Sequence, residues 1–395
     1  MKNTKLFALA LVALLPLALT ACLKPVSLDA YGYVAAIAVD EGEDGGYYFT
    51  LALQRELAEQ NTELEGGAIL LADSGANIFE ALSRMEGSVP YSINFSRANF
   101  IVMPSALAER GALHELAFMD HDRLRMRTSA AVVVTECRAY EFLGAMYSNN
   151  DANINKLQSA LTLDSKRTGM ARVMSLSRLI EAELTGESDF VTILASRDEN
   201  IITDMEQKKA ESEGKDPLED VKPGERVGGL KAYMTGTALF SGCRMTGRLT
   251  RDETLIFNLL MGELEQGTLS AQTGEGRMTV ALMNASSSSR ASVSGGRLEI
   301  ALEVRVFAEE LMRSPALSEQ TSEDFIENGL PAMLEERIIS VLQKLSAASC
   351  DPLRAKRRAK GASRLTREQM EEAYMNAVFS VRVRVTPVAR SDKRG

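Results

Sequence analysis

The chain contains no tryptophan, only two histidines and only four cysteines among its 395 residues. So few imidazoles and thiols leave little material for a zinc site, which takes several such ligands. The two histidines, His114 and His121, are seven residues apart and would lie about 10.5 Å apart along one helix, too far to share an ion. We therefore predict no bound metal.

Basic charge is also scarce. The 45 Lys and Arg residues are outnumbered by 54 Asp and Glu residues, which gives a net charge of −9. Such an acidic chain is a poor candidate for binding nucleic acid. Apolar residues make up 45% and charged residues 25% of the sequence, which is ordinary for a folded protein and excludes wholesale disorder.

A short apolar run opens the sequence. Residues 6–19 follow two lysines and form an apolar run interrupted only by Pro16. The run is too short to span a bilayer but is typical of a signal peptide. The run ends in Leu-Thr-Ala-Cys at 19–22, which resembles the lipobox of bacterial lipoproteins. We predict that residues 1–21 are removed and that lipidated Cys22 anchors the body at an extracytoplasmic membrane face. The alternative is an ordinary secretory signal with a chance cysteine.

The rest of the sequence divides at a charged segment. Residues 196–229 combine many acidic and basic residues with Pro217 and Pro223, a composition typical of a linker or long loop. This predicts an N-terminal domain over 22–195 and a C-terminal domain over 230–395. Strands and helices are mixed without a steady βαβ rhythm. That favours an α+β fold, with mixed and antiparallel β-sheets flanked by helices, over a doubly wound sheet.

Periodicity and turn chemistry predict the main elements of the first domain. They are a hairpin of strands 33–39 and 47–53, a helix over 76–85, a strand at 100–103, a helix that Ser105 caps and that runs to 118 with a break at Gly111, a strand at 130–135 and mostly helix over 153–185.

In the second domain the same reasoning predicts a strand at 230–240, a turn over 241–248 and a helix from Thr250 to Met261 that begins with a capping box through Glu253. Alternating apolar residues predict strands at 298–306 and 379–385. Pro331 marks the start of an amphipathic helix between them.

Motifs of catalysis are missing from the sequence. It contains no P-loop, and Gly274-Glu275-Gly276 fails the dinucleotide-binding pattern. It also contains no G-x-S-x-G nucleophile elbow. The odd number of remaining cysteines, Cys137, Cys243 and Cys350, gives no disulfide framework, and each is expected to be a small buried side chain. We assign no catalytic residue and no cofactor.

One basic region stands out near the C-terminus. From residue 354 to the end there are 12 basic and 4 acidic residues, against the acidic balance of the whole chain. Five of the basic side chains are candidates for contact with an anionic surface or an acidic partner: Arg354, Lys356, Arg357, Arg358 and Lys360. The alternative is a solvated loop and helix start.

Several segments, taken in order, resemble motifs of one family. They are Tyr-Val-Ala-Ala-Ile-Ala-Val-Asp at 33–40, the helix at 75–82, the stretches 94–111 and 118–134, and the segment 236–260. Together with the lipobox they resemble the Ger(x)C lipoproteins, the C subunits of bacterial spore nutrient-germinant receptors. Leu23, Ser96 and Asp120 depart from residues common in that family, which indicates a divergent member.

The resemblance implies an α+β, non-enzymatic subunit that is lipid-anchored on the outer face of the spore's inner membrane. It implies partnership with an A subunit and a multi-spanning B subunit of the germinant receptor. The alternative is an extracytoplasmic solute-binding lipoprotein of a transporter. The α+β succession of strands and helices along the sequence and an aromatic content of only 6% argue against the two α/β lobes with an apolar or aromatic-lined cleft that are common in that class.

Overall fold

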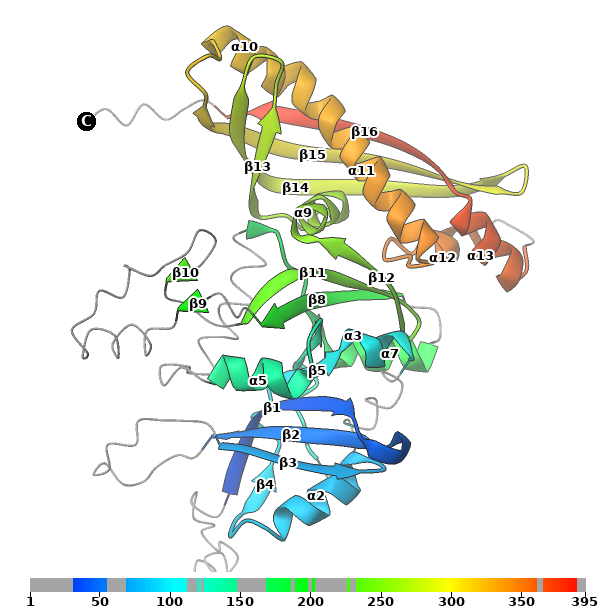
Figure 1. The fold of residues 1–395 in the computed structure, drawn as a ribbon. Helices are drawn as coiled ribbons and strands as arrows, with labels where there is room; N and C mark the ends of the chain where they lie inside the picture. The colour runs from blue at the N-terminus through cyan, green and yellow to red at the C-terminus, as the bar shows by residue number, and fades with distance from the viewer. Residues whose placement is uncertain are drawn as a thin grey trace, which may run out of the picture.

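A computed structural model shows two main sheets stacked end to end, the first sheet in the lower part of Figure 1 and the second at its top. The structure describes residues 31–54, 69–111, 119, 121, 124–147, 168–185, 189–197, 201–202, 226–227, 232–360 and 365–388. Cys22 lies outside these residues. Over the described ranges, no helix is both long and apolar enough to cross a membrane.

The first sheet has ten strands and a parallel centre. Its main order is β12-β11-β8-β6-β5-β1-β2-β3, with β4 beside β1 and β7 beside β6. The strands are β1 (Tyr31–Glu41), β2 (Tyr47–Gln54), β3 (Ile69–Gly75), β4 (Ser92–Asn94), β5 (Phe100–Pro104), β6 (Ala131–Thr135), β7 (Met174–Ser175), β8 (Phe190–Arg197), β11 (Ala232–Ser241) and β12 (Arg244–Thr250). Strands β1, β5, β6 and β8 pair in parallel, and antiparallel hairpins flank them on both sides.

Helices cover both faces of this sheet, which is why its central strands are apolar on both sides. The core on one face contains side chains of α2 (Ile78–Glu86), α3 (Ser105–Glu109) and α7 (Leu176–Thr185). The core on the other face contains Phe142 and Leu143 of α5 (Ala139–Tyr147). The predicted α+β class, with mixed sheets flanked by helices, is confirmed.

Asp40, at the end of β1, holds the start of α5 across 99 residues of sequence. The carboxylate is 1% exposed, and its two oxygens accept hydrogen bonds from the backbone N–H groups of Ala139 and Tyr140, each at 2.8 Å. These N–H groups have no partner within the helix, because the first turn never does. Asp40 therefore fastens α5 to the parallel centre of the sheet.

We expect Asp40→Asn to lower the free energy of unfolding by about 1–3 kcal/mol, the usual loss for an unsatisfied buried donor. The amide keeps only one acceptor oxygen and presents an N–H group to one of the two donors. Urea unfolding measures the effect. Asp73→Asn, at a partly exposed carboxylate that accepts from the neighbouring Ser74 N–H and lies 3.9 Å from Arg84, is the matched control and should change stability by less than about 0.5 kcal/mol.

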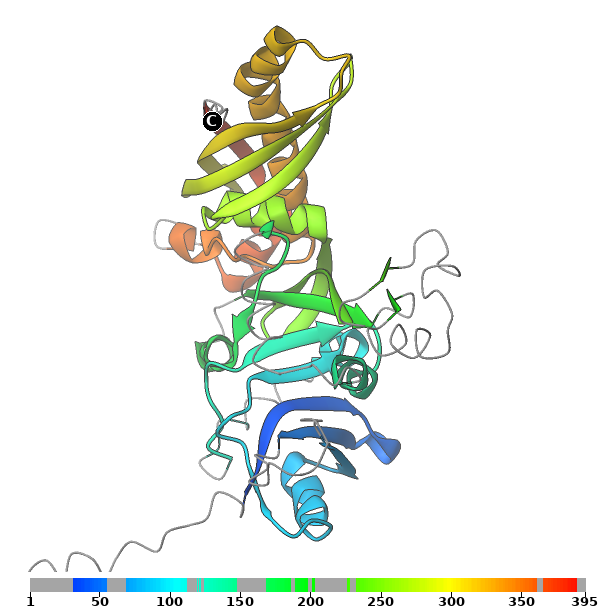
Figure 2. The same cartoon turned by 90° about the vertical axis from the view of Figure 1, so that its left-hand side faces the viewer.

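The second sheet has four strands in sequence order. They are β13 (Gln266–Gln272), β14 (Arg277–Ser294), β15 (Arg297–Arg313) and β16 (Val378–Pro387), antiparallel except for the parallel pair β15 and β16. Helices α9 (Arg251–Met261) and α11 (Leu330–Ala347) pack on one face, as Figure 2 shows. Three shorter helical segments complete this half: α10 (Glu319–Asp324) with a π-helical turn at Phe325–Gly329, α12 (Ala355–Lys360) and α13 (Arg367–Met375).

Strands β11 and β12 join the two halves. They belong to the first sheet, yet α9 of the second half follows β12 directly. The core of the second half includes Val191, Leu239 and Leu249 from the first sheet. The predicted linker thus connects two neighbouring antiparallel strands, β8 and β11. Within it the structure places only the end of β8 and the short strands β9 (Ile201–Ile202) and β10 (Arg226–Val227). The division into domains stays a prediction.

Most predicted elements are confirmed, including the first hairpin and the capping box of α9, in which Thr250 and Glu253 bond reciprocally. Two details are wrong. Ser105 does not cap α3, because Pro104 takes the cap position. Helix α3 ends at Glu109, near the predicted break at Gly111, and the predicted continuation to residue 118 lies outside the described residues. The turn predicted for 241–248 is only the two residues between β11 and β12. The helix predicted for 153–185 is described only from residue 168, where α7 follows strand β7.

Candidate interaction surface

The five basic residues singled out in the sequence lie on α12 and on the residue before it. Ala355 and Ala359, one turn apart, are the buried face of this short helix. Arg354, Arg357, Arg358 and Lys360 are exposed. Lys356 is different, since its side chain is only 17% exposed.

Lys356 lies between carboxylates from both halves of the molecule. Its Nζ is 3.0 Å from Asp189, just before β8, and 2.9 Å from Glu371 on α13. Burial lowers the pKa of Lys356, but these two carboxylates outweigh burial and raise it, so the group stays charged. Lys356 thus takes part in an ion pair inside the molecule and is not available to contact a partner. The candidate contact surface therefore consists of the other four basic residues.

Asp189 also accepts hydrogen bonds at this place where the two halves meet, which we call the junction. Its oxygens accept the backbone N–H groups of Gly242, at 3.0 Å, and of Asp351, at 2.9 Å. Asp351 is itself buried and accepts the N–H of Lys356 at 2.7 Å. Burial raises the pKa of the Asp351 carboxyl, although Lys356 opposes that effect. Three polar residues thereby tie β8, the β11–β12 turn and α12 together.

The third cysteine and a tyrosine complete this junction. Burial raises the pKa of the Cys350 thiol and also that of the Tyr374 hydroxyl. The Tyr374 hydroxyl donates to the Cys350 carbonyl at 2.6 Å. A buried thiol with a raised pKa is a poor nucleophile. The expectation that Cys350 is a buried apolar side chain is therefore confirmed.

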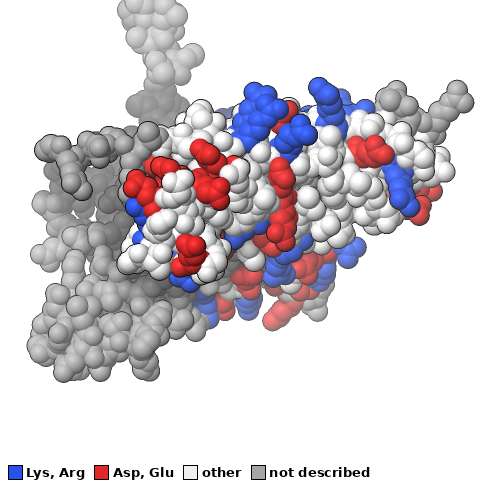
Figure 3. Space-filling model, turned by 90° about the horizontal axis from the view of Figure 1, so that it is seen from above, with Lys and Arg blue, Asp and Glu red and all other residues white. Residues whose placement is uncertain are grey.

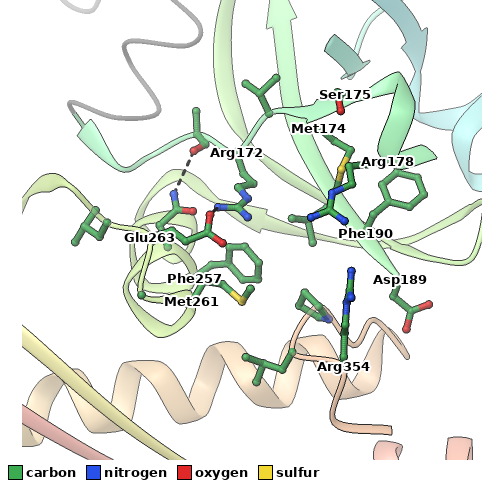
Figure 4. A pocket seen from close by; sticks show the side chains of 18 of the residues that line it. Arg172, Met174, Ser175, Arg178, Asp189, Phe190, Phe257, Met261, Glu263 and Arg354 are labelled. Carbon is green, nitrogen blue, oxygen red and sulfur yellow. Dashed lines mark hydrogen bonds and ion pairs between the residues drawn. The ribbon is translucent and has the colours of Figure 1, made fainter. Parts of the chain in front are cut away.

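A groove of about 1250 Å³ opens beside this junction. One wall comes from residues 171–181 around β7 and α7, another from the end of α9, and a third from the turn at Pro352–Arg354 (Figure 4). Phe190 and Phe257 form buried parts of its lining. Arg354 and Arg358, two of the predicted contact residues, lie in this lining.

Sequence reasoning missed the residues that the first half contributes to the groove. Arg172 forms an ion pair with Glu263, which lies two residues after the end of α9, and Arg178 pairs with Glu181 at 2.7 Å. Arg354 lies 3.9 Å from the same Glu181. Nothing in the spacing of residues 172–189 could have placed them opposite residues 352–358, because the two segments meet only through the packing of the two sheets.

No group of three or more His, Cys, Asp or Glu side chains that could hold a metal occurs in the part of the chain that the structure describes. His121 packs edge-on against Phe79, with ring centroids 5.2 Å apart. His114 lies outside that part.

Acidic and basic side chains are interspersed on the surface at the far end of the second sheet (Figure 3). On strands β15 and β16, Glu303 pairs with both Arg305 and Arg384, at 3.1 and 3.3 Å.

Two protein-family models match the chain in succession. The first, described as "Spore germination protein N-terminal domain", covers residues 25–196. The second, described as "Spore germination B3/ GerAC like, C-terminal", covers residues 235–387. Among curated proteins, nothing matches the chain.

The fold resembles a solved structure. The crystal structure of the GerBC protein superposes with a TM-score of 0.53, covering 89% of this chain and 97% of that chain. The two sequences are only 13% identical, so this likeness concerns the fold alone. Both matched family segments contribute to the groove, the first through residues 171–191 and the second through residues 257–285 and 352–358.

Proposed function

The chain belongs to the GerAC-like family of spore germination proteins, and we propose that it is the lipid-anchored C subunit of a spore germinant receptor. In this role it carries no catalytic activity and acts through protein–protein contacts at the membrane. The observation that carries the proposal is the succession of the two family segments along nearly the whole mature chain.

The partners in this proposal are the A and B membrane subunits of the receptor. The proposed location is the outer face of the spore's inner membrane, with diacylglycerol on Cys22 as the anchor. Eight residues lie between Cys22 and β1, and the chain from Cys22 to β1 reaches at most about 30 Å when fully extended. The body would therefore stay within contact distance of membrane subunits.

The test of the function is germination of spores that lack this gene. They should fail to respond to nutrients yet respond normally to a trigger that bypasses the receptors. Restoration of the nutrient response by the wild-type gene would support the proposal. Normal nutrient germination in a strain that has no paralogue of the gene would contradict it.

The anchor can be tested separately with Cys22→Ala. We expect the variant to leave the membrane fraction and to restore the nutrient response only weakly, because the two acyl chains provide the stable attachment. Fractionation of spore membranes with immunodetection measures the first effect. Cys243→Ala, at a half-buried cysteine, is the matched control and should remain membrane-bound. An anchored Cys22→Ala protein would refute lipidation at this residue.

The second candidate, a solute-binding lipoprotein, is favoured by one observation, the groove beside the junction. A ligand that binds only the folded protein raises its thermal midpoint in a concentration-dependent way. Thermal unfolding of the purified protein with amino acids and sugars therefore separates the two candidates. A rising midpoint would support solute binding, whereas a receptor subunit that acts through protein–protein contacts does not require a bound solute.

A further inference from the structure

The groove beside the junction has an excess of positive charge at one end. Arg178, from α7, and Arg354, from the turn before α12, have side chains that are 56% and 46% exposed and point into the groove from opposite walls (Figure 4). Both lie near the single carboxylate of Glu181. Arg358 donates its hydrogen bonds to the carbonyl and hydroxyl oxygens of Ser289, which are neutral.

Two guanidinium groups of the lining, those of Arg178 and Arg354, thus lie beside one carboxylate at this end of the groove. The hydrogen bond from Arg178 and the charges of Arg178, Arg354 and Arg357 lower the pKa of Glu181. Of the other charged residues in the lining, Arg172 pairs with Glu263 and Asp189 pairs with Lys356, and Glu265 follows Glu263 by two residues. Near Arg178 and Arg354, where Glu181 is the one carboxylate that pairs with both, an anion that enters from outside would therefore meet more positive than negative charge.

The backbone at the groove is strained. Within the described residues, four that are not glycine have a clearly positive φ, and two of them, Asn284 at 51° and Arg354 at 56°, line the groove. Side-chain-bearing residues rarely adopt this conformation, and it persists where the surroundings impose it, often at binding sites. At Arg354 it accompanies a side chain that points into the groove.

The size and lining of the groove fit an extended peptide segment. Its volume of about 1250 Å³ exceeds the roughly 300–1,000 Å³ of ordinary small-molecule sites. Met174 and Met261 are partly exposed on its walls, and methionine adapts well to the apolar side chains of a partner. A bilayer surface could not enter a concave site, so the concavity favours protein over lipid as the source of the anion.

We propose that this groove binds an extended segment of a partner protein that carries acidic and apolar side chains. Arg178 and Arg354 contact its carboxylates, and Met174 and Met261 contact its apolar side chains. The inference rests on the proposed function, because the partner is taken to be another subunit of the receptor complex.

Site-specific crosslinking in spores tests the proposal on the full-length, lipidated chain. The photoreactive residue benzoylphenylalanine replaces Met174, and the crosslinked product is identified by mass spectrometry. We expect a product with another receptor subunit in which the crosslinked peptide contains several Asp or Glu residues. The yield should fall at least tenfold when Arg178→Glu and Arg354→Glu are combined, since like charges repel across an interface.

Three further variants make the result specific. Arg178→Gln with Arg354→Gln should lower the yield without adding negative charge beside Glu181, which guards against misfolding of the reversed variant. Arg382→Glu, at an exposed arginine of β16, should leave the yield unchanged. Exchange of the acidic residues in the identified peptide for lysine should restore the yield in the Arg178→Glu, Arg354→Glu background.

Several outcomes would overturn the inference. They are a product with lipid alone, no protein product, a crosslinked peptide without acidic residues, or a yield that both double variants leave unchanged. The proposed function has its own separate test in the deletion strain. Loss of nutrient germination on deletion, together with full germination and an unchanged crosslink in the double variants, would refute the groove proposal and leave the receptor role intact.

Discussion

A Lys356→Met variant is expected to lose about 3–5 kcal/mol of unfolding free energy at neutral pH, the usual loss when one partner of a buried ion pair is removed. Methionine is close in length to lysine, so the packing changes little. The change leaves Asp189 and Glu371 without the cation that lies 3.0 and 2.9 Å from them. Denaturant unfolding of the purified protein measures the loss.

The pH dependence of this loss identifies its cause. Burial already raises the pKa of Asp351 above its ordinary value of 3.8, and Lys356 opposes that shift, so the pKa should rise further in the variant. A carboxyl with a raised folded pKa binds its proton more tightly in the folded state, and its stabilising effect is lost as the pH rises through that pKa. The deficit of the variant should therefore shrink as the pH falls from 7 towards about 4.

Lys344→Met provides the matched control. Lys344 belongs to α11, is about half exposed and pairs with Glu253 at 2.5 Å. Exposed ion pairs of this kind contribute at most about 1 kcal/mol. A loss for Lys356→Met no larger than that of the control, or one that does not shrink on acidification, would mean that the ion pair at the junction is not what stabilises it.

The contrast between Lys356 and its neighbours shows what the sequence could not reveal. In the sequence, Arg354 to Lys360 is one basic run. The structure divides it, because α12 buries Ala355 and Ala359 and turns Lys356 towards carboxylates of two distant segments. The spacing of the two alanines could have indicated the buried side of the helix. The identity of the acidic partners, Asp189 and Glu371, depends on tertiary contacts that no local pattern encodes.

Local signals were reliable where local chemistry decides the structure. The turn between β1 and β2, the capping box of α9 and Pro331 in the first turn of α11 all use residues within a few positions of one another. Longer-range pairing was not predictable in the same way. Strands β11 and β8 are neighbours in one sheet although residues 198–231 separate them, and their charged composition suggested a boundary between independent bodies.

A single glycine in β11 is critical to the pairing of this strand with β12, and Gly236→Ala is expected to destabilise the protein by about 3 kcal/mol or more. Gly236 follows a bulge in the pairing with β8 and lies opposite Thr250 of β12. Its φ is 157°, and an added Cβ would lie 1.9 Å from the carbonyl oxygen of Leu249. Because that atom belongs to the backbone, it can move only if β12 separates from β11.

The consequences should extend into the second half of the molecule. Thr250, next to the displaced carbonyl, forms the capping box that begins α9, and α9 supplies one wall of the groove. Gly274→Ala, at an exposed glycine where an added Cβ would meet nothing within 4 Å, should change stability by less than about 0.5 kcal/mol. Urea unfolding compares the two variants. If Gly236→Ala unfolds like the control, β11 and β12 tolerate more separation than the close approach at Leu249 implies. The junction would then depend on the ion pair at Lys356 more than on the packing of these two strands.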